Sequence, residues 1–243
     1  METDLTICRE ALNRDPVLYL DLTESVRRGE GRVLGAAPHG ALVAFNNLID
    51  GPASRYTMFA DDERTAQTLL TLLPANPGFV CVHEDFYWDQ LERRFGFSKL
   101  RPCQQVGWLR TVSPAEPETG AKIRRLEAAN LPAVCASYQL EGEEYLSWLI
   151  SRGELYGAFE GETLMGFIGR HAEGIIGLLE VLPQYRRRGL GRQLQAHMIG
   201  LELSRNRVPY GQVFLDNDAS LALQHSMGMN CSMGRLYWAT RDD

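Results

Sequence analysis

The stretch LLEVLPQYRRRGLGRQLQ, residues 178–195, decides the fold because it joins three kinds of local pattern in order. An apolar run predicts a strand, a basic segment with glycines follows, and a helical period then begins. Leu190, Leu194, Met198 and Leu201 fall on one face at helical spacing. The sequence therefore predicts a strand, a tight loop and a helix of an α/β protein.

Several arginines crowd this loop and repel one another: Arg186, Arg187, Arg188 and Arg192, around Gly189 and Gly191. Elsewhere acidic residues prevail, since 25 Lys and Arg stand against 31 Asp and Glu, a net charge of −6. Proteins that bind nucleic acids work through phosphate neutralisation and are usually basic. The cluster therefore favours a small anionic ligand, and we expect no nucleic-acid partner.

A strand that runs through such a loop into a helix forms a cradle for anions. The helix N-terminus offers unpaired N–H groups and the positive end of the dipole. Gly189 and Gly191 let phosphate oxygens approach the main chain, and arginines can pair with the same oxygens. A diphosphate fits better than a single carboxylate. The alternative is a solvated basic helix start with a tight turn.

The remaining composition predicts a cytoplasmic protein without a membrane partner. The five cysteines are scattered and include no C-x-x-C pair, which favours reduced thiols over disulfides or a zinc site. The N-terminus METDLTICREALNRD is acidic and unlike a secretory signal. No apolar run is long enough to span a bilayer.

Two series of strands and helices flank the proline-rich stretch VSPAEPETG, residues 112–120. We predict a domain over 1–112, a linker over 113–120 and a second domain over 121–243. The first domain is expected to contain helices at 15–29, 61–74 and 85–97, and strands at 40–45, 55–60, 78–84 and 105–111. The second is expected to contain helices at 130–139, 142–153, 191–206 and 220–229, and strands at 121–126, 155–160, 163–169, 175–182, 211–216 and 235–240.

The two halves repeat one another. VCVHEDFYWDQLERRFGF (80–97) and VFLDNDASLALQHSMGM (213–229) both read as strand, turn, short helix, glycine and large apolar residue. One constant offset aligns four pairs: Asp85 with Asn217, Leu91 with Leu223, Gly96 with Gly228, and Phe97 with Met229. Duplication explains this better than chance similarity of two common units.

The segments LLEVLPQYRRRGLGRQL and VFLDNDASLALQHSMGM, in this order, resemble the GNAT superfamily of acyl-CoA-dependent N-acyltransferases. The resemblance covers about residues 121–240, and more narrowly the chain is similar to tandem proteins of the glycine N-acyltransferase-like type. It implies two GNAT-like halves, each a twisted mixed sheet flanked by helices (α/β, or α+β), the first half degenerate.

The resemblance also implies a coenzyme A site. The pyrophosphate would be held by the loop, and the arginines would then be compensated by the co-substrate rather than by carboxylates of the chain. Leu179 and Val181 would lend backbone groups to the pantetheine arm, which Asn217 and Gln224 would contact. An alternative for Asn217 is a helix N-cap. The predicted cofactor-binding residues are Leu179, Val181, Arg186, Arg187, Arg188, Gly189, Leu190, Gly191, Arg192, Asn217 and Gln224.

The corresponding junction of the first half reads MFADDERTAQ, with Asp61, Asp62 and Glu63 in place of arginine and glycine. Carboxylates there complement the helix dipole and would repel a diphosphate. The sequence therefore predicts one coenzyme site, in the second half.

Acid and base residues are harder to assign. In the superfamily the general acid is often a Tyr seven residues after the motif Asn, and this chain has Gln224 at that position. A frequent position of the general base, five residues before the Asn, holds Gln212. A glutamine amide is neither a useful acid nor a useful base. Glu180 is the candidate base, because partial burial in its strand would raise its pKa. Pairing with a nearby arginine is an equal alternative.

Further polar candidates have plainer alternatives. His171 and Glu173 are candidates for a base acting through water, although a solvated turn is the expected setting for them. His225 and Cys231 are expected to be structural or exposed. The aromatic residues Tyr145, Trp148, Tyr156, Phe159 and Trp238 either line an acceptor pocket or pack in the core.

The sequence thus predicts an N-acyltransferase, acting as an N-acetyltransferase on the amine of a small molecule by direct transfer from acetyl-CoA or another acyl-CoA, without a metal. The alternative is a non-catalytic CoA-binding or assembly module, supported by glutamine at the two usual acid and base positions. The expected oligomeric state is a monomer or homodimer.

Overall fold

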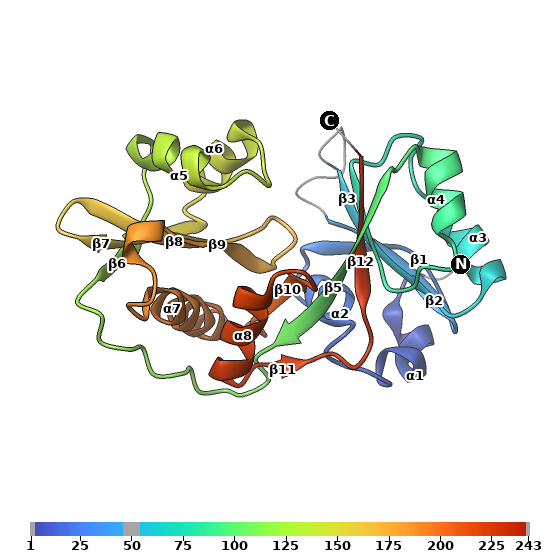
Figure 1. The fold of residues 1–243 in the computed structure, drawn as a ribbon. Helices are drawn as coiled ribbons and strands as arrows, with labels where there is room; N and C mark the ends of the chain where they lie inside the picture. Colours follow the sequence, from blue (N-terminus) through green and yellow to red (C-terminus); the bar gives the residue numbers. More distant parts are fainter. Residues whose placement is uncertain (1–2, 46–53, 242–243) are drawn as a thin grey trace. The chain divides into compact units, whose positions relative to one another are not determined.

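A computed structural model describes residues 3–45 and 54–241 (Figure 1). It contains two sheets flanked by helices, which confirms the predicted mixed α/β class. Contacts divide the chain into two compact units. Unit 1 is Met1–Gly107, Gln212–Leu221 and Asn230–Asp243, and unit 2 is Trp108–Gly211 and Ala222–Met229. Strand β10 (Tyr210–Phe214) and helix α8 (Asp218–Met227) supply residues to both.

Unit 1 is built on an eight-stranded sheet within the described residues, in the order β1-β2-β3-β4-β12-β5-β10, with β11 paired to β5. Its strands are β1 (Gly31–Ala37), β2 (Gly40–Phe45), β3 (Arg55–Ala60), β4 (Phe79–Val82), β5 (Lys99–Gly107), β11 (Asn230–Cys231) and β12 (Leu236–Thr240). Its helices are η1 (Leu5–Cys8), α1 (Arg9–Leu12), α2 (Leu20–Arg27), α3 (Glu63–Leu70) and α4 (Trp88–Phe95).

Two apolar clusters cover the two faces of this sheet. On one face Leu69 of α3 and Leu91 of α4 pack with Met58 and Val82. On the other, residues of α1 and α2 pack with the alternate strand positions, such as Phe59. Successive side chains of a strand point to opposite faces. The nearly continuous apolar runs of β3 and β4 are therefore buried on both faces of the sheet.

Strand β12 lies between β4 and β5 and pairs antiparallel with both. Trp238 is opposite Cys81 on one side and Arg101 on the other. The predicted domain division at 113–120 remains a prediction. The contacts nevertheless group this late strand with the sheet of the first half.

Unit 2 is built on a four-stranded antiparallel sheet, β6 (Lys122–Arg125), β7 (Leu155–Glu160), β8 (Thr163–Arg170) and β9 (Ile176–Val181), in that order. Helices α5 (Leu131–Ser137) and α6 (Glu143–Ser151), with the short η3 (Ala128–Asn130), cover one face. Helix α7 (Leu190–Ser204) covers the other face and contacts β7, β8 and β9 (Figure 1). Strand β9 ends this sheet.

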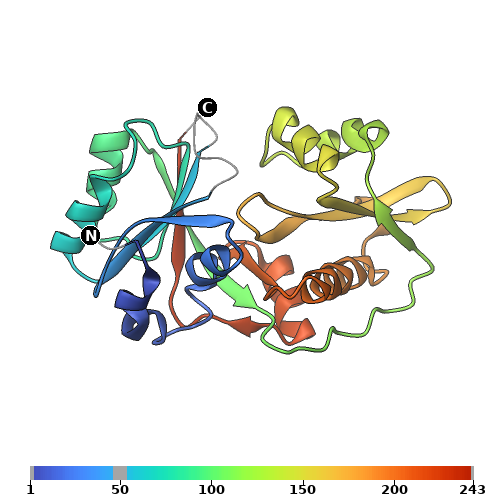
Figure 2. The ribbon, with the colours of Figure 1, turned by 180° about the vertical axis from the view of Figure 1, so that it is seen from behind.

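The predicted linker runs alongside α7 in both views (Figures 1 and 2). The Thr119 hydroxyl donates to the Gln193 side chain, and Glu116 lies 3.5 Å from Nδ1 of His197. Residues 193 and 197 are one turn apart and share a face of the helix. The segment forms no helix or strand over 113–120, yet it packs on unit 2 rather than acting as a free spacer.

Most predicted elements are confirmed, but the short elements η1, α1 and β11 were not expected, and three further differences concern longer elements. Strand β1 was not expected, because Gly31–Ala37 is glycine-rich and short of apolar alternation. Strand β5 spans Lys99–Gly107 instead of 105–111. Helix α2 begins at Leu20 instead of at residue 15, and the Asp15 carboxylate accepts hydrogen bonds from the N–H groups of Leu18, Met233 and Gly234.

Candidate active site

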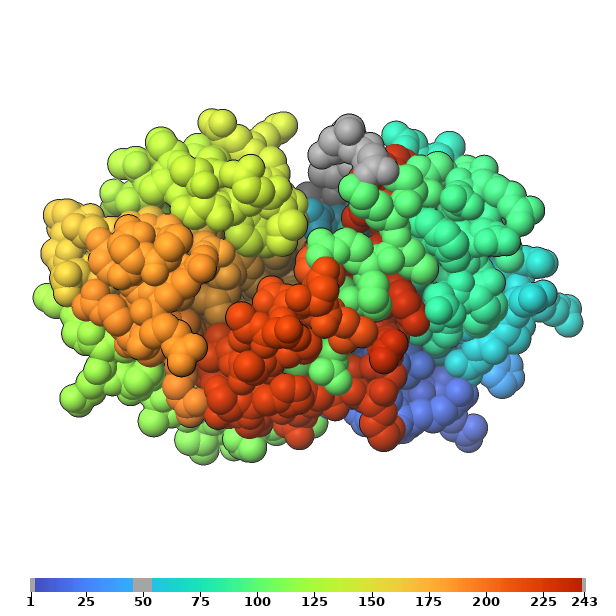
Figure 3. Space-filling model, in the orientation of Figure 1, coloured from blue at the N-terminus to red at the C-terminus, as the bar shows by residue number. Residues whose placement is uncertain are grey.

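The arginine loop leads from β9 into α7 through the short helix η4 (Pro183–Tyr185). Gly189 has a left-handed backbone (φ 81°) and occupies the N-cap of α7 without a side-chain hydrogen bond. Arg187 is also left-handed (φ 64°), which is uncommon for a residue with a Cβ atom. The loop is exposed and lies within the orange part of the surface in Figure 3. Its backbone is thus curved and open to solvent.

The N–H groups of this loop are available to a ligand. Within residues 3–45 and 54–241, no group accepts a hydrogen bond from the backbone N–H of residues 187–192. Consecutive free N–H groups in a curved segment form an anion-binding concavity, reinforced by the helix dipole. The Leu190 side chain is buried, so only its main chain can face an anion. The loop therefore has the geometry of a phosphate cradle.

Three of the four arginines already have partners in the protein. Arg186 pairs with Glu180 at 3.0 Å, Arg188 lies 3.4 Å from Glu160, and Arg192 donates to the Ser226 carbonyl. The expectation that no carboxylate of the chain compensates the arginines is therefore wrong for Arg186 and Arg188.

Both ion pairs of the loop are exposed, and such pairs contribute only about 0–1 kcal/mol. The arginines can therefore turn to a phosphate at little cost. In the described part of the chain, the Arg187 guanidinium has no ion-pair or hydrogen-bond partner. Arg187 is thus the arginine most available to an anion.

The edge strand β9 is irregular at Leu178. The register advances two residues on β8, from Phe167 to Gly169, against three on β9, from Glu180 to Gly177. Leu178 takes up the extra residue with φ 54°, although such a conformation costs a bulky side chain about 1–3 kcal/mol. Bulges of this kind re-aim peptide groups beside active sites.

Leu179 and Val181 follow this bulge on β9 and are half-buried. Their strand has no neighbour on its outer side within the described sheet. The edge of β9 is therefore open to pairing with an extended ligand arm, and this role of Leu179 and Val181 remains a prediction.

Gln224 lies on α8 with 5% exposure. Its Oε1 is fully buried and has no hydrogen-bond partner among the described residues. Leaving a buried acceptor unsatisfied costs about 1–3 kcal/mol, so a ligand donor there would be stabilising. Asn217 accepts a hydrogen bond from the Ser220 N–H at 3.0 Å, as expected for the N-cap alternative, and its contact with a coenzyme remains a prediction.

The candidate base Glu180 is held by Arg186, the contact that the alternative interpretation expects. Its side chain retains 26% exposure. Arg186 also donates to the Val181 carbonyl, which fixes the guanidinium against the strand. The role of Glu180 as a base remains a prediction.

His171 and Glu173 do not lie in a solvated turn, so that expectation is wrong. They are 3% and 0% exposed. Nδ1 of His171 lies 3.3 Å from the Tyr145 hydroxyl, and the Glu173 carbonyl accepts from Tyr210 at 2.7 Å. Tyrosine side chains from α6 and β10 thus hold the turn between β8 and β9.

Cys231 is half-buried, and this burial raises the pKa of its thiol above the ordinary value. A protonated thiol is a poor nucleophile, which agrees with the structural interpretation of this cysteine.

Gln212, at a usual base position, belongs to a buried polar network of unit 1. It donates to Gln105 at 2.8 Å and accepts from the Trp238 indole. Gln105 in turn donates to Asp21, which pairs with His83 at 3.1 Å. Gln212 therefore serves the packing of the sheet.

Asp21, Cys81 and His83 place three potential metal-ligand atoms within 4.8 Å of one another. The Thr57 hydroxyl is 2.5 Å from Asp21 and 3.4 Å from His83. Burial opposes charge on both ionised groups. Their mutual attraction and hydrogen bonds outweigh it, so the pKa of Asp21 is lowered and that of His83 raised. Asp21 and His83 are thus hydrogen-bonded partners in the core of unit 1.

The corresponding junction of unit 1 is closed. The Asp62 carboxylate caps α3 by accepting from the Thr65 N–H and hydroxyl, each at 2.8 Å. Strands β3 and β4 pair in parallel up to Met58 and Val82. Beyond them the Glu84 carboxylate accepts from the Ala60 N–H. N–H groups at the end of the strand and the start of the helix thus have carboxylate partners in unit 1, whereas those of residues 187–192 have none among the described residues.

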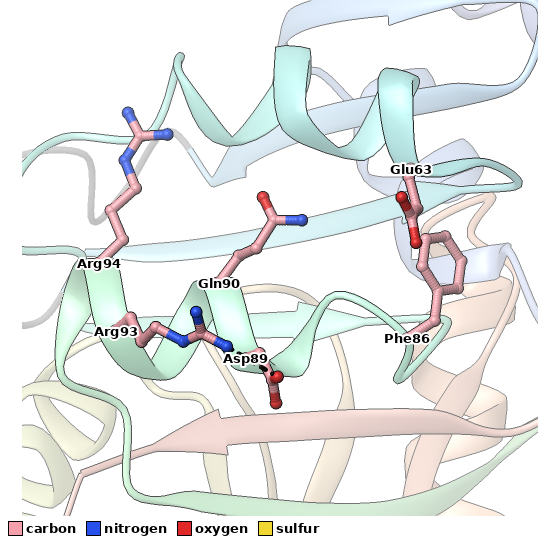
Figure 4. A pocket seen from close by; sticks show the side chains of 6 residues that line it. All are labelled: Glu63, Phe86, Asp89, Gln90, Arg93 and Arg94. Carbon is pink, nitrogen blue, oxygen red and sulfur yellow. Dashed lines mark hydrogen bonds and ion pairs between the residues drawn. The ribbon is translucent and has the colours of Figure 1, made fainter.

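A depression of about 470 Å³ does lie between α3 and α4 (Figure 4). Its exposed lining carries both charges, and Arg93 is paired with Asp89 at 3.0 Å. The lining residues are Glu63, Phe86, Asp89, Gln90, Arg93 and Arg94.

Comparison with known proteins agrees with the geometry of unit 2. Residues 121–229 match the Acetyltransferase (GNAT) family, so this part of the chain is a GNAT acetyltransferase family domain. The chain is 38% identical over 79 residues to N-alpha-acetyltransferase RimI of Mycobacterium tuberculosis. That match covers 30% of this chain and 49% of the relative, so the chain spans about half the length of this curated relative.

Solved structures show the same fold over more of the chain. A Drosophila protein solved by X-ray crystallography superposes with a TM-score of 0.63 at 18% identity, covering 83% of this chain and 79% of that one. A GCN5-related N-acetyltransferase from Sphaerobacter thermophilus gives 0.54 at 18% identity, covering 98% and 92%. A GCN5-related N-acetyltransferase-like protein from Streptococcus suis gives 0.55 at 13%, covering 96% and 100%.

Proposed function

We propose that the GNAT domain transfers an acetyl group, or another acyl group, from coenzyme A to the nitrogen of an amine. The observation that carries this proposal is the uncapped start of α7 beside the free edge of β9. An anion cradle and an unpaired strand edge, adjacent in sequence, suit a ligand with a diphosphate and an amide-bearing arm.

The free N–H groups of residues 187–192 and the Arg187 guanidinium would hold the pyrophosphate, with Arg186, Arg188 and Arg192 close by. The β9 edge at Leu179 and Val181 would bind the arm, together with Asn217 and Gln224. The unsatisfied Oε1 of Gln224 supports this assignment, because it lacks a donor that the arm's amides or thiol would supply.

Acyl-CoA supplies an activated thioester carbonyl. The amine nitrogen attacks this carbon, the carbon–sulfur bond breaks, and the amine loses one proton while the sulfur gains one. Glu180 is the proposed acceptor of the proton, and Arg186 keeps this carboxylate in place. Gln224 can donate a hydrogen bond to the departing sulfur but has no proton to release at neutral pH. An amine that arrives neutral would lessen the demand on Glu180.

The acceptor is an amine of a small molecule or, as a second candidate, the α-amino group of a polypeptide. The second is favoured by the partial similarity to RimI, which is named an N-alpha-acetyltransferase. We keep the cytoplasm as the expected location, where acetyl-CoA is plentiful. Among the described residues, no helix combines the length and apolar character needed to cross a membrane.

The proposal is tested by calorimetric titration with acetyl-CoA and with free CoA, followed by release of free thiol in the presence of amino acids, polyamines and short peptides. One saturable site per chain and thiol release with an amine would support it. Saturable binding without release for any amine would favour a non-catalytic CoA-binding module. Absence of binding to either compound would contradict both.

A further inference from the structure

The His171 ring lies directly against the start of β9. A Cβ atom added to Gly177 would lie 2.8 Å from two atoms of that ring, closer than real Cβ contacts. Glycine is therefore required at 177 because the imidazole occupies the space beside it. Leu178, the left-handed residue of the bulge, follows at once.

The imidazole is itself held in place from α6. The Tyr145 hydroxyl lies 3.3 Å from Nδ1 of His171 and accepts a hydrogen bond from the Ala172 N–H at 3.1 Å. The two rings are stacked, with an interplanar angle of 21° and centroids 6.1 Å apart. The Glu141 carboxylate lies 3.7 Å from the same nitrogen. His171 is thus fixed by a phenol, a carboxylate and the turn that carries it.

Leu178 is held from the other side by the apolar core. Its side chain is 2% exposed and packs in a cluster with Leu146 of α6 and Leu155 of β7. A bulky residue with positive φ persists only where its surroundings determine it. Here the core fixes the side chain, and the His171 ring fixes the preceding residue.

We propose that His171 is a positioning residue that holds Leu178 in its left-handed conformation and so sets the direction of the peptide groups at the bulge. This rests on the proposed function, in which the pantetheine arm of coenzyme A lies along β9. The arm would run from the arginine loop, at the C-terminal end of the strand, toward Gly177. Four residues of strand span about 13 Å, which places the acyl end of the arm near the bulge. A change at His171 should therefore displace the acyl group and leave the binding of the pyrophosphate by the loop unchanged.

The test compares His171→Ala with a matched control, His197→Ala. The His197 ring also packs against a tyrosine, with its centroid 5.2 Å from that of Tyr156 although the rings are tilted, and its Nδ1 is also close to a glutamate, Glu116 at 3.5 Å, but His197 lies on α7. The first readout needs no ligand: the NMR coupling between the amide and α hydrogens of Leu178 reports its φ. We expect this coupling to change in His171→Ala and to stay unchanged in His197→Ala.

The second readout separates binding from turnover. In His171→Ala, kcat should fall about tenfold or more while the Kd for free CoA stays within about twofold, because only the acyl end is displaced. In a Leu178→Gly background, the further change His171→Ala should have little effect on kcat, since glycine adopts positive φ unaided.

An unchanged Leu178 coupling in His171→Ala would overturn the proposal whatever the enzyme does. The proposal would also be overturned if His171→Ala lowered CoA affinity and kcat by the same factor. It would be overturned as well if His171→Ala lowered kcat in the Leu178→Gly background as much as in the wild type. Wild-type protein that releases no thiol with any amine would instead contradict the proposed function, and the coupling would still decide whether His171 holds the bulge.

Discussion

The two strand-to-helix junctions, β3 to α3 in unit 1 and β9 to α7 in unit 2, differ in what their polar groups do. In unit 1 the helix is capped by Asp62, and β3 is paired with β4. In unit 2 the helix begins at an uncapped left-handed Gly189, and β9 has no outer neighbour in its sheet. The same succession of elements is therefore closed by its own side chains in one unit and left open to a ligand in the other.

We expect the stability of unit 1 to depend most on the buried pair of Asp21 and His83. Asp21→Ala leaves His83 charged or unsatisfied in the core, and breaking such a pair costs about 3–5 kcal/mol. Hydrogen exchange of peptides from unit 1 would measure the loss locally. Asp62→Ala, which removes the cap of α3, is the milder control at about 1 kcal/mol. Equal effects of the two changes would refute the importance of the pair.

The same pair gives unit 1 a defined pH dependence. Because the pKa of His83 is raised, its stabilisation is complete below its unfolded value of about 6.5 and is lost as the pH rises through the folded pKa. Because the pKa of Asp21 is lowered, its stabilisation is present above about 3.9 and is lost as the pH falls through the folded pKa. The stability difference between wild type and an Asp21→Asn, His83→Gln variant should therefore be largest between these limits. A difference that does not vary with pH would argue against a charged pair.

The open junction should fail if it is made to resemble the closed one. Gly189→Asp adds a carboxylate and a Cβ atom at φ 81°, and we expect CoA affinity to fall about 100-fold or more. Gly96→Asp is the matched control, because Gly96 is also left-handed with open space around it but lies in unit 1. Calorimetry of both variants measures the effect. Normal CoA binding by Gly189→Asp would show that the loop is not the site.

Glu180→Gln tests the base. The amide cannot accept the proton, so kcat should fall about 100-fold while CoA affinity changes little. Unchanged turnover would leave Glu180 as no more than the partner of Arg186.

The smallest expected effect is the loss of CoA affinity when single arginines of the loop are replaced. Arg187→Ala should weaken CoA binding about tenfold, since this guanidinium has no partner in the described residues and is free for phosphate. Arg186→Ala should weaken it less, because Arg186 is already bound to Glu180 and to the Val181 carbonyl. The reverse order in calorimetric titrations would assign the phosphate to the paired arginine.

The elements of unit 2 follow from sequence because their signals are local. The apolar period of α7 and the glycines of its loop lie within a few turns of one another. The bulge at Leu178 gave no such signal, because the contact of the His171 ring with Gly177 exists only in the folded hairpin. A glycine followed by leucine before a predicted strand end is too common to indicate it.

Pairing between distant segments was equally hidden. Pairing of Glu180 with a nearby arginine could be inferred from sequence, but Arg188 and Glu160 are 28 residues apart and only the folded chain brings them together. The insertion of β12 between β4 and β5 could not be inferred, since a strand's apolar pattern says which faces are buried but not which neighbours it has.

That insertion has a consequence for how the protein is made. When β5 leaves the ribosome at Gly107, its partner β12 has not been synthesised, and more than half of the 243-residue chain separates the two strands. At about 5–20 residues per second, translation leaves the facing edges of β4 and β5 without their strand for about 6–26 seconds. Exposed strand edges promote aggregation. Expression of residues 1–112 alone should therefore give an aggregating product, and the yield of the whole chain should respond to chaperones that shield nascent strands.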